Sequence, residues 1–220
     1  DHSQGLSYKM VDVISHAMGN VPRYIRVNRV VRDIPHKSIE GGLKCSNMRQ
    51  LVDNKMNEKG LTTKCIRTRE VKLKDYDVNN IKLTITEYES SSGTEYFIEY
   101  NSKDGTDTLY GFCRLRLNKE WNDVLPFLYG CALIQELHVY GLHTSVGTND
   151  NDTTQHKGLG TSLLKKAEEI AFKNGYKKIA VISGVGVRGF YKKRGYALNN
   201  NRMIKKLERN QFISFVIEDS

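Results

Sequence analysis

Hydrophobic and polar residues alternate along the middle of the chain, a pattern typical of antiparallel β-strands that bury one face. Three alternating stretches are separated by two short segments of Ser, Lys, Asp and Gly, which predict turns. A fourth, largely apolar stretch follows them. The pattern therefore predicts four successive strands, over residues 81–88, 94–100, 109–117 and 131–140.

On either side of these strands, apolar residues recur every three or four positions, as they do on the buried face of a helix. A helix over residues 8–20 should end ahead of Pro22. A second helix, over residues 47–59, should begin at an N-cap Ser46 and stop at Gly60. After the strands, the pattern predicts a helix over 161–173, a strand over 178–183, a helix over 188–194 and a strand near 203–207.

Strands in series, followed by alternating strands and helices, predict an α+β fold with a mixed central sheet flanked by helices. A chain of 220 residues can bury about 70% of its unfolded surface, enough for one large domain with an appendage. The changes of period and charge predict three parts. These are a basic helical and extended segment over residues 1–75, the α+β domain over 76–210 and an apolar tail over 211–220.

The net charge of +9 is distributed unevenly along the chain. Residues 20–75 contain 14 Lys and Arg against 6 Asp and Glu, and residues 151–220 contain the same numbers. Residues 76–150 are acidic, with 5 against 11. Two basic segments that flank an acidic one indicate a protein that binds a polyanion such as a nucleic acid. The alternative is a solvated basic surface without a partner.

Several classes of protein do not fit the composition. No stretch of about 18 apolar residues is present, so we expect no membrane span, and without a basic-then-apolar leader we expect no secretion. The four cysteines stand far apart, without a Cys-x-x-Cys pair. We therefore expect a reducing compartment, no disulfide and no metal site, with Cys113 and Cys131 as small core residues.

The segment Gln-His-Lys-Gly-Leu-Gly, residues 155–160, opens directly onto the helix expected from residue 161. Glycines lack a Cβ, so the backbone can turn tightly and approach a ligand closely. The first N–H groups of a helix have no partner within it, and together with the helix dipole and Lys157 they favour an anion. The segment thus predicts a phosphate-binding loop, and the alternative is an ordinary tight loop.

This loop resembles that of the GCN5-related N-acetyltransferase superfamily when it is read together with the aromatic segment Phe-Tyr-Lys-Lys-Arg-Gly-Tyr at 190–196. Glu-Leu-His-Val-Tyr-Gly (136–141) and Ala-Val-Ile-Ser-Gly-Val-Gly-Val-Arg (180–188) narrow the resemblance to the acetyltransferase-like domain of the Elongator catalytic subunit family. Basic segments upstream are similar to the stretch that precedes this domain in the same family. The resemblance extends over about residues 8–207.

The resemblance implies the fold of that superfamily and a binding site for acetyl-CoA. The diphosphate would lie on backbone amides of the loop, and the pantetheine arm would lie between two parallel strands that splay apart, residues 133–140 and 178–183. The residues expected to bind acetyl-CoA are Leu137, His138, Val139, Gln155, His156, Lys157, Gly158, Leu159, Gly160, Thr161, Phe190 and Tyr191.

Three residues are candidates for the chemistry. Tyr191 is the candidate acid, because a phenol with a pKa near 10 can protonate a departing thiolate. The family carries two adjacent tyrosines here, whereas this chain has Phe190 first, so a role of that first hydroxyl does not carry over. Glu136 and His138 alternate onto one face of their strand, and either can act as a general base. The alternatives are core packing for the aromatic residues and a structural hydrogen bond for Glu136.

The resemblance also implies that tRNA and other Elongator subunits are partners. Residues 23–34 should be extended, because arginine recurs every third residue among apolar ones. The residues expected to contact RNA are Arg23, Arg26, Arg29, Arg32, Lys44, Arg49, Lys64, Arg67 and Arg69.

Full-length members of the family carry a radical S-adenosylmethionine half with a cysteine-bound iron–sulfur cluster. The widely spaced cysteines of these 220 residues do not provide its ligands, so we expect neither the cluster nor S-adenosylmethionine in this chain. The chain instead resembles the C-terminal part of such a protein. Cys65, with Thr63 and Thr68 nearby, is a single thiolate and does not make the zinc site of some relatives.

We therefore expect the acetyl-CoA-binding, acyltransferase-like part of an enzyme that modifies the wobble uridine of tRNA, in the cytoplasm or the nucleus. It would use or hydrolyse acetyl-CoA. One alternative is a histone lysine acetyltransferase, for which the acidic middle segment offers a groove. Another is a non-catalytic RNA-binding module, against which the intact loop and Tyr191 argue.

Overall fold

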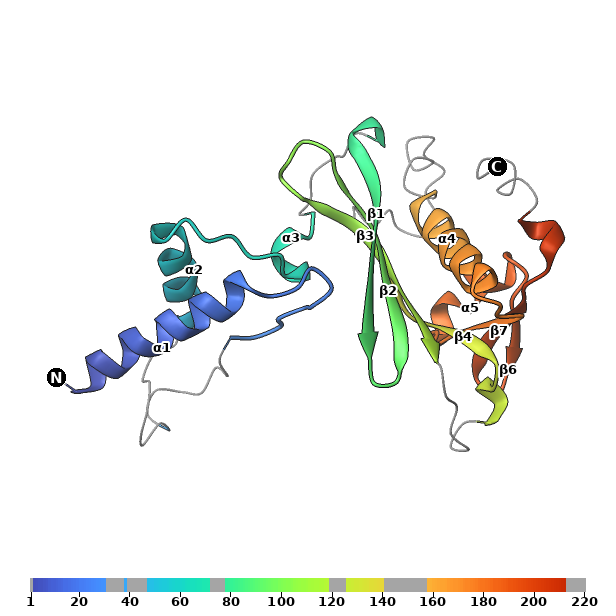
Figure 1. The fold of residues 1–220 in the computed structure, drawn as a ribbon, viewed down its shortest axis with the longest axis horizontal. Coiled ribbons are helices and arrows are strands. Elements are labelled where there is room, and N and C mark those ends of the chain that lie inside the picture. Colours follow the sequence, from blue (N-terminus) through green and yellow to red (C-terminus); the bar gives the residue numbers. More distant parts are fainter. Residues whose placement is uncertain are drawn as a thin grey trace. The chain divides into compact units, whose positions relative to one another are not determined.

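A computed structural model of the chain describes residues 2–30, 38, 47–71, 78–118, 126–140 and 158–212 (Figure 1). The chain forms two compact units, Asp1–Glu70 and Val71–Ser220. The boundaries that the sequence predicts between the three parts of the chain, after residue 75 and after residue 210, stay predictions.

The first unit is built from helices around a small apolar core. It contains α1 (His2–Gly19), α2 (Met48–Glu58) and the single turn α3 (Ile66–Arg69). The two longer helices were predicted from the spacing of their apolar residues, whereas α3 is too short to show a period. The core is made by Val11, Met18, Met48, Val52, Met56 and Cys65.

Helix α2 ends where its glycine predicts. Gly60 has a φ of +62°, a conformation in which the Cβ of other residues clashes with the backbone. Its N–H donates to the carbonyl of Asn57 (3.1 Å), and the N–H of Leu61 donates to the carbonyl of Met56 (2.8 Å). This Schellman pattern satisfies carbonyl groups at the helix end. At the other end the N-cap is Asn47, while the residue predicted for that role lies outside the described ranges.

The second unit contains one seven-stranded sheet in the order β1-β2-β3-β4-β5-β7-β6. Strands β4 and β5 are parallel, and all other neighbours are antiparallel. A parallel pair needs a crossover, which helix α4 (Leu159–Lys173) supplies. The strands are β1 (Ile81–Ser90), β2 (Gly93–Ser102), β3 (Leu109–Asn118), β4 (Cys131–Val139), β5 (Lys178–Val181), β6 (Ala197–Asn199) and β7 (Arg202–Lys206).

Helix α4 lies across one face of the sheet (Figure 1). Leu163, Leu164 and Ala167 on its apolar side are fully buried among alternate residues of β2, β3 and β4. Helix α5 (Arg188–Lys192) adds Tyr191 to the same cluster. The predicted mixed α+β sheet flanked by helices is confirmed. Short β6 was not predicted, and the tail from residue 213 lies outside the described ranges.

The start of α4 differs from the prediction. The helix begins at Leu159, so Gly160 lies in its first turn and not in the preceding loop. A Cβ built on Gly160 would lie 3.5 Å from Cγ2 of Val139 and 3.7 Å from Cζ of Phe190. Burial of this turn against β4 and α5 offsets the poor helix propensity of glycine, which costs about 1 kcal/mol.

The described cysteines are core residues. Cys65, Cys113 and Cys131 are free thiols and are buried, and burial raises the pKa of Cys113 well above its usual range. Within the described ranges, no cluster of three or more His, Cys, Asp or Glu residues is suited to a metal ion. None of the helices in these ranges has the length and apolar character needed to cross a membrane.

Candidate functional site

Strands β4 and β5 separate part-way along their parallel pair. The pairing ends with Ile134 opposite Val181, and a last hydrogen bond runs from the N–H of Ile182 to the carbonyl of Ile134 at 3.2 Å. β4 then continues to Val139. Along this second half, β4 has no strand partner on its β5 side among the residues that the structure describes.

A β-bulge decides where the main chain of this second half points. In the pairing of β3 with β4, Arg114 lies opposite Glu136 and Leu115 lies opposite Ile134. Gln135 of β4 therefore has no partner on β3 and is an extra residue. Beyond it, the N–H of Tyr140 donates to β3 at 2.8 Å. Because successive residues of a strand direct their main-chain groups to opposite sides, Leu137 directs its N–H and carbonyl groups away from β3.

Val139 shares this orientation, whereas His138 does not. The carbonyl of His138 faces β3, since a Cβ on Gly111 would lie only 2.9 Å from that oxygen. Of the three residues expected to bind pantetheine through the backbone, the geometry therefore brings Leu137 and Val139 to the open side of β4. His138 contributes its side chain to one face of the sheet instead.

The N-terminus of α4 supplies open hydrogen-bond donors next to this side of β4. The first bond of the helix runs from the N–H of Ser162 to the carbonyl of Gly158 at 2.9 Å. The N–H groups of Leu159, Gly160 and Thr161 precede it and have no acceptor among the described residues. Three free donors and the positive end of the helix dipole suit an anion.

Gly158 leaves the space in front of these donors clear. It is the exposed N-cap residue of α4, with φ −83° and ψ −41°, and no atom of the described residues lies within 4 Å of a Cβ built on it. Its conformation is one that other residues adopt freely. Glycine is therefore not needed here for backbone conformation or for packing within the chain.

Three of the expected elements converge at this point. Gly160 of α4 lies between Val139 at the end of β4 and Phe190 of α5. Gln155, His156 and Lys157, expected to complete the loop, lie outside the described residues.

Tyr191 lies in the core cluster that also includes Cys113 and contacts Leu137 and Val139. Burial is the largest cause that raises its pKa, to about 12; Cys113 adds to the effect and Arg194 opposes it. The expected value near 10 is therefore too low. The hydroxyl stays protonated as a donor, but it is a weaker acid than a thiol, whose ordinary pKa is about 8.5. It suits stabilisation of a thiolate by a hydrogen bond better than complete proton transfer.

The two candidate bases lie on the other face of β4, away from α4. Glu136 and His138 are both exposed. The guanidinium Nε of Arg114 lies 3.9 Å from the carboxylate of Glu136. The ring of His138 packs against that of Tyr140, with 4.4 Å between centroids. Both side chains can therefore contact a water molecule or the acceptor of an acyl group that approaches this face.

A hydrogen-bonded network holds Arg114 beside Glu136. Its guanidinium Nη1 donates to the hydroxyl of Tyr88 (2.7 Å), which donates to the carboxylate of Glu95 (2.8 Å). Glu95 in turn accepts from Arg116 (3.0 Å). Burial, followed by the bond to Glu95, raises the pKa of Tyr88 to about 12, so this donor stays protonated.

Sequence reasoning missed Arg194, which joins α5 to the first turn of α4. Its Nε and Nη2 donate to Oγ1 of Thr161 at 3.1 and 2.6 Å, and its Nη1 donates to the carbonyl of Phe190 at 2.7 Å. The guanidinium lies over the ring of Phe190, 3.6 Å from the centroid. Its partner Thr161 is 33 residues away in sequence, so no local pattern reveals the contact.

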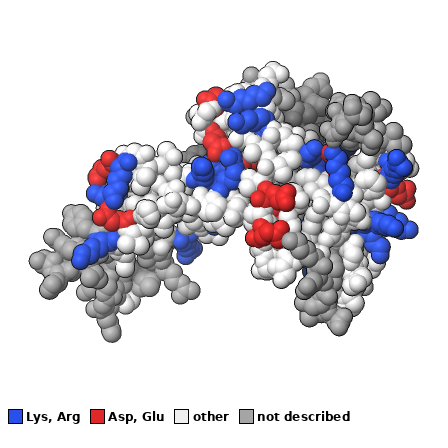
Figure 2. Space-filling model, in the orientation of Figure 1, with Lys and Arg blue, Asp and Glu red and all other residues white. Residues whose placement is uncertain are grey.

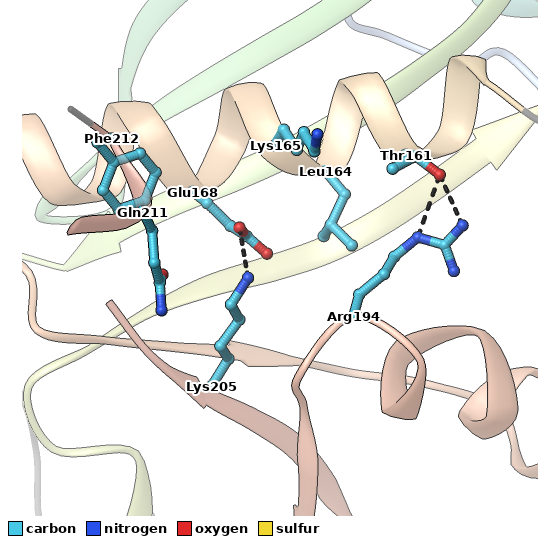
Figure 3. A pocket seen from close by; sticks show the side chains of 8 residues that line it. All are labelled: Thr161, Leu164, Lys165, Glu168, Arg194, Lys205, Gln211 and Phe212. Carbon is cyan, nitrogen blue, oxygen red and sulfur yellow. Dashed lines mark hydrogen bonds and ion pairs between the residues drawn. The ribbon is translucent and has the colours of Figure 1, made fainter. Parts of the chain in front are cut away.

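A cavity of about 330 Å³ runs along α4 from this contact (Figure 3). Lys165, Arg194 and Lys205 line it, together with the single carboxylate of Glu168. Glu168 is engaged on both oxygens, by Tyr196 at 2.8 Å and by Lys205 at 2.8 Å. The other two charged residues of the lining, Lys165 and Arg194, are basic, so the cavity is suited to an anionic group.

The basic residues expected to contact RNA differ in how free they are. Arg29, Lys64 and Arg67 are exposed, and Arg67 also donates to the carbonyl of Asn28. Arg26 is paired with Glu70, and Arg49 is paired with Asp53 at 3.1 Å. Arg23 is half-buried, while Arg32 and Lys44 lie outside the described residues. In the face shown in Figure 2, Lys and Arg form separate groups with Asp and Glu between them.

Arg69 faces inward and differs from the other basic candidates. It is only 6% exposed, and its guanidinium donates to the carbonyl groups of Lys64 (3.0 Å) and Arg23 (2.8 Å). We expect Arg69→Ala to lower the free energy of unfolding of the first unit by about 1.5–3 kcal/mol, because two carbonyl groups lose a charged donor. Denaturant unfolding followed by circular dichroism measures this, with Arg29→Ala as the control, because Arg29 is exposed and has no partner among the described residues. Equal stability of the two variants would contradict a structural role.

Comparison with known proteins shows the family of the chain. Residues 66–196 match the model of the Acetyltransferase (GNAT) family. The chain is 40% identical over 211 residues to the tRNA uridine(34) acetyltransferase of Methanocaldococcus jannaschii, covering 90% of this chain and 38% of that protein. It is 37% identical over 210 residues to Elongator complex protein 3 of Drosophila melanogaster, covering 91% and 37%. The chain thus spans less than two fifths of the length of these relatives.

A solved structure is similar over nearly the whole chain. Elp3 of the archaeon Methanocaldococcus infernus, with an N-terminal deletion, aligns with a TM-score of 0.74 at 36% identity. The alignment covers 91% of this chain and 49% of that structure. The family model covers more than half of the chain and includes β4, α4 and α5, so the chain belongs to the GNAT acetyltransferase family.

Proposed function

We propose that the chain binds acetyl-CoA and forms the acyl-transferring part of an enzyme that modifies the wobble uridine of tRNA. The observation that carries the proposal is the junction of β4 with α4. There, main-chain groups of Leu137 and Val139 face a side of β4 that has no strand partner among the described residues, beside three N–H groups of α4 that have no acceptor among the same residues. Relatives named tRNA uridine(34) acetyltransferase and Elongator complex protein 3 support tRNA as the acceptor.

Acetyl-CoA has the groups that this junction can bind. Its diphosphate oxygens would accept hydrogen bonds from the free N–H groups at the start of α4, from Leu159 to Thr161. The two amides of its pantetheine arm would pair with the main chain of Leu137 and Val139, as an added strand would. Its nucleotide end, which carries a further phosphate, would reach the basic cavity along α4.

The chemistry follows from the two faces of β4. When water attacks the thioester carbonyl, the carbon–sulfur bond breaks and its electron pair leaves on the thiolate. The hydroxyl of Tyr191, on the α4 side, would stabilise that thiolate. Glu136 or His138, on the other face, would take the proton that the water loses. A nucleophile on a docked acceptor would follow the same course with its own proton.

A single incubation tests the proposed function. The protein is mixed with acetyl-CoA, with and without total tRNA, and release of free CoA is followed together with the mass of the tRNA nucleosides. Calorimetry in parallel measures the dissociation constant of acetyl-CoA. We expect acetyl-CoA to bind and its turnover to respond to tRNA. Absence of acetyl-CoA binding by the folded protein would refute the proposal.

Exposed arginines of the first unit are expected to contact tRNA phosphates. Arg29 is the sharpest test, because it is exposed and has no partner among the described residues. Arg29→Ala should weaken tRNA binding for all sequences and reduce the slope of log K against log salt concentration by about 1, since one fewer phosphate is neutralised. Gel-shift titrations across a salt series measure this.

Lys82→Ala provides the matched control for Arg29→Ala. Lys82 is an exposed cation on β1, in the acidic part of the sequence. The control should leave both the affinity and the salt slope unchanged. If Arg29→Ala and Lys82→Ala behave alike, the first unit is not the tRNA-binding surface.

A protein lysine acetyltransferase is the second candidate, because the exposed carboxylate of Glu136 can accept a proton from a lysine ammonium. Labelled acetyl-CoA with histones as acceptor tests it. Formation of acetyl-lysine at catalytic rates would favour this candidate. For the tRNA enzyme, we further propose that other Elongator subunits are partners and that the reaction takes place in the cytoplasm or the nucleus.

A further inference from the structure

The hydroxyl of Thr161 lies at the centre of the contact between α4 and Arg194 (Figure 3). Thr161 belongs to the first turn of α4, beside the free N–H groups of Leu159 and Gly160. A hydroxyl oxygen has two acceptor positions and one proton to donate. Two N–H groups on one edge of the Arg194 guanidinium donate to this oxygen, at 3.1 and 2.6 Å, so the oxygen is the acceptor in this contact.

Because the oxygen accepts from Arg194, the hydroxyl proton is directed away from the guanidinium and can be donated to another group. The structure shows no acceptor for that proton among the described residues. The guanidinium also withdraws electron density from the oxygen, which strengthens the O–H as a donor. An anion at the start of α4 would thus meet a hydroxyl with a fixed direction, in addition to the backbone N–H groups.

The position of Arg194 is itself well defined. Its Nη1 donates to the carbonyl of Phe190 at 2.7 Å, and its plane lies over the ring of Phe190. The backbone that follows is turned by Gly195, which has a φ of +85°. A guanidinium can hold this carbonyl and the Thr161 oxygen together because its donors form a planar fork. A lysine ammonium at the same position has no such fork.

We propose that Arg194 is a positioning residue for the diphosphate of acetyl-CoA, acting through the hydroxyl of Thr161. The proposal rests on the proposed function, because it needs acetyl-CoA at the start of α4. Arg194 fixes the hydroxyl as a donor to a diphosphate oxygen. It makes α5, which carries Tyr191, part of the same binding site as the first turn of α4.

A second contact makes it possible to separate this role from a purely structural one. On the sheet side, the hydroxyl of Tyr100 is hydrogen-bonded to Ser162 at 2.7 Å and also fixes the first turn of α4. Tyr100→Phe removes that bond without altering the bonds to Thr161. If Arg194 only held the helix in place, Tyr100→Phe and Arg194→Met should weaken acetyl-CoA binding alike.

The experiment measures the affinity for acetyl-CoA in a double-mutant cycle of Arg194→Met and Thr161→Val. Each single variant should weaken binding by about tenfold or more, the usual effect of losing one hydrogen bond to a charged group. The double variant should lose little beyond either single one, because both changes remove the same donor. Thr161→Ser keeps the hydroxyl and should bind normally, and Arg194→Lys should not restore binding.

The same variants are also compared with S-acetylpantetheine, which lacks the diphosphate, through kcat/KM. None of them should change that value more than Tyr100→Phe does. Additive losses in the cycle, full rescue by Arg194→Lys, or an equal loss with S-acetylpantetheine would each overturn the role of Arg194. A wild-type protein that folds but does not bind acetyl-CoA would instead refute the proposed function.

Discussion

Turnover of acetyl-CoA is expected to fall by about 10²–10⁴-fold in Tyr191→Phe, the usual range for a group that assists proton transfer or stabilises a leaving group. The hydroxyl is the proposed donor to the thiolate, and phenylalanine removes it while keeping the ring. The ring should keep its edge-on contacts with Phe190 (5.1 Å) and Tyr196 (5.6 Å). We therefore expect kcat to fall and the affinity for acetyl-CoA to stay unchanged. Release of CoA, followed with a thiol reagent, measures kcat.

The pH dependence of the wild-type protein provides a second check on Tyr191. Its pKa is raised to about 12, so the donor is present at all pH values well below that. No loss of rate through its ionisation should occur between pH 7 and 10. An unfolded tyrosine ionises near pH 10, so this group destabilises the fold only as the pH rises beyond 10.

The control for Tyr191→Phe is Tyr129→Phe, because Tyr129 is 70% exposed ahead of β4 and should have no effect on turnover. A Tyr191→Phe variant with wild-type kcat would remove Tyr191 from the mechanism. A wild-type rate that declines with an apparent pKa near 10 would instead contradict the raised pKa of its hydroxyl.

The affinity for acetyl-CoA is expected to fall by about 10²-fold in Gly158→Val. No atom of the residues that the structure describes lies within 4 Å of a Cβ at Gly158, and its φ and ψ suit any residue, so the variant should fold as the wild type does. The valine methyl groups would instead occupy the space that the diphosphate needs in front of α4. Loss of one or two charge-assisted hydrogen bonds, each contributing about 1.5–3 kcal/mol, gives the expected magnitude. Calorimetry measures the affinity, and thermal unfolding checks the fold.

Two further variants make the test at Gly158 specific. Gly158→Ala should have a smaller effect than Gly158→Val, because its side chain is shorter. Gly189 of α5 likewise has no atom within 4 Å of a built Cβ, so Gly189→Val serves as the control. Wild-type affinity in a folded Gly158→Val variant would show that the diphosphate does not lie at the start of α4.

The sequence predicts the strands, the longer helices and their order, because each follows a repeat of apolar residues. It places the start of α4 two residues too late, since glycine favours loops and Gly160 reads as part of one. Tertiary contact overrides that preference here, as Gly160 packs between Val139 and Phe190. The single turn α3 and the three-residue β6 are too short to show a repeat of apolar residues, so the sequence does not predict them.

The candidate site is predicted less completely than the fold. The spacing of the motifs predicts a role for the residues around Gly158 and for Tyr191. It does not reveal Arg194, which follows α5 and whose partner Thr161 belongs to α4. The pKa of Tyr191 depends on burial, which a sequence does not show. Among the basic candidates, only the fold distinguishes buried Arg69 from exposed Arg29.

One inserted residue gives β4 two different neighbours in succession. Up to Ile134 the strand shares its amides with β5, and after Gln135 the same edge becomes free for a guest molecule while the sheet stays continuous through β3. A ladder that kept Gln135 but had no bulge would turn the amides of Leu137 towards β3 and exchange the sides on which Glu136 and its neighbours project, whereas excision of Gln135 would leave both as they are. The binding edge and the reactive face thus depend together on how the strand accommodates one extra residue.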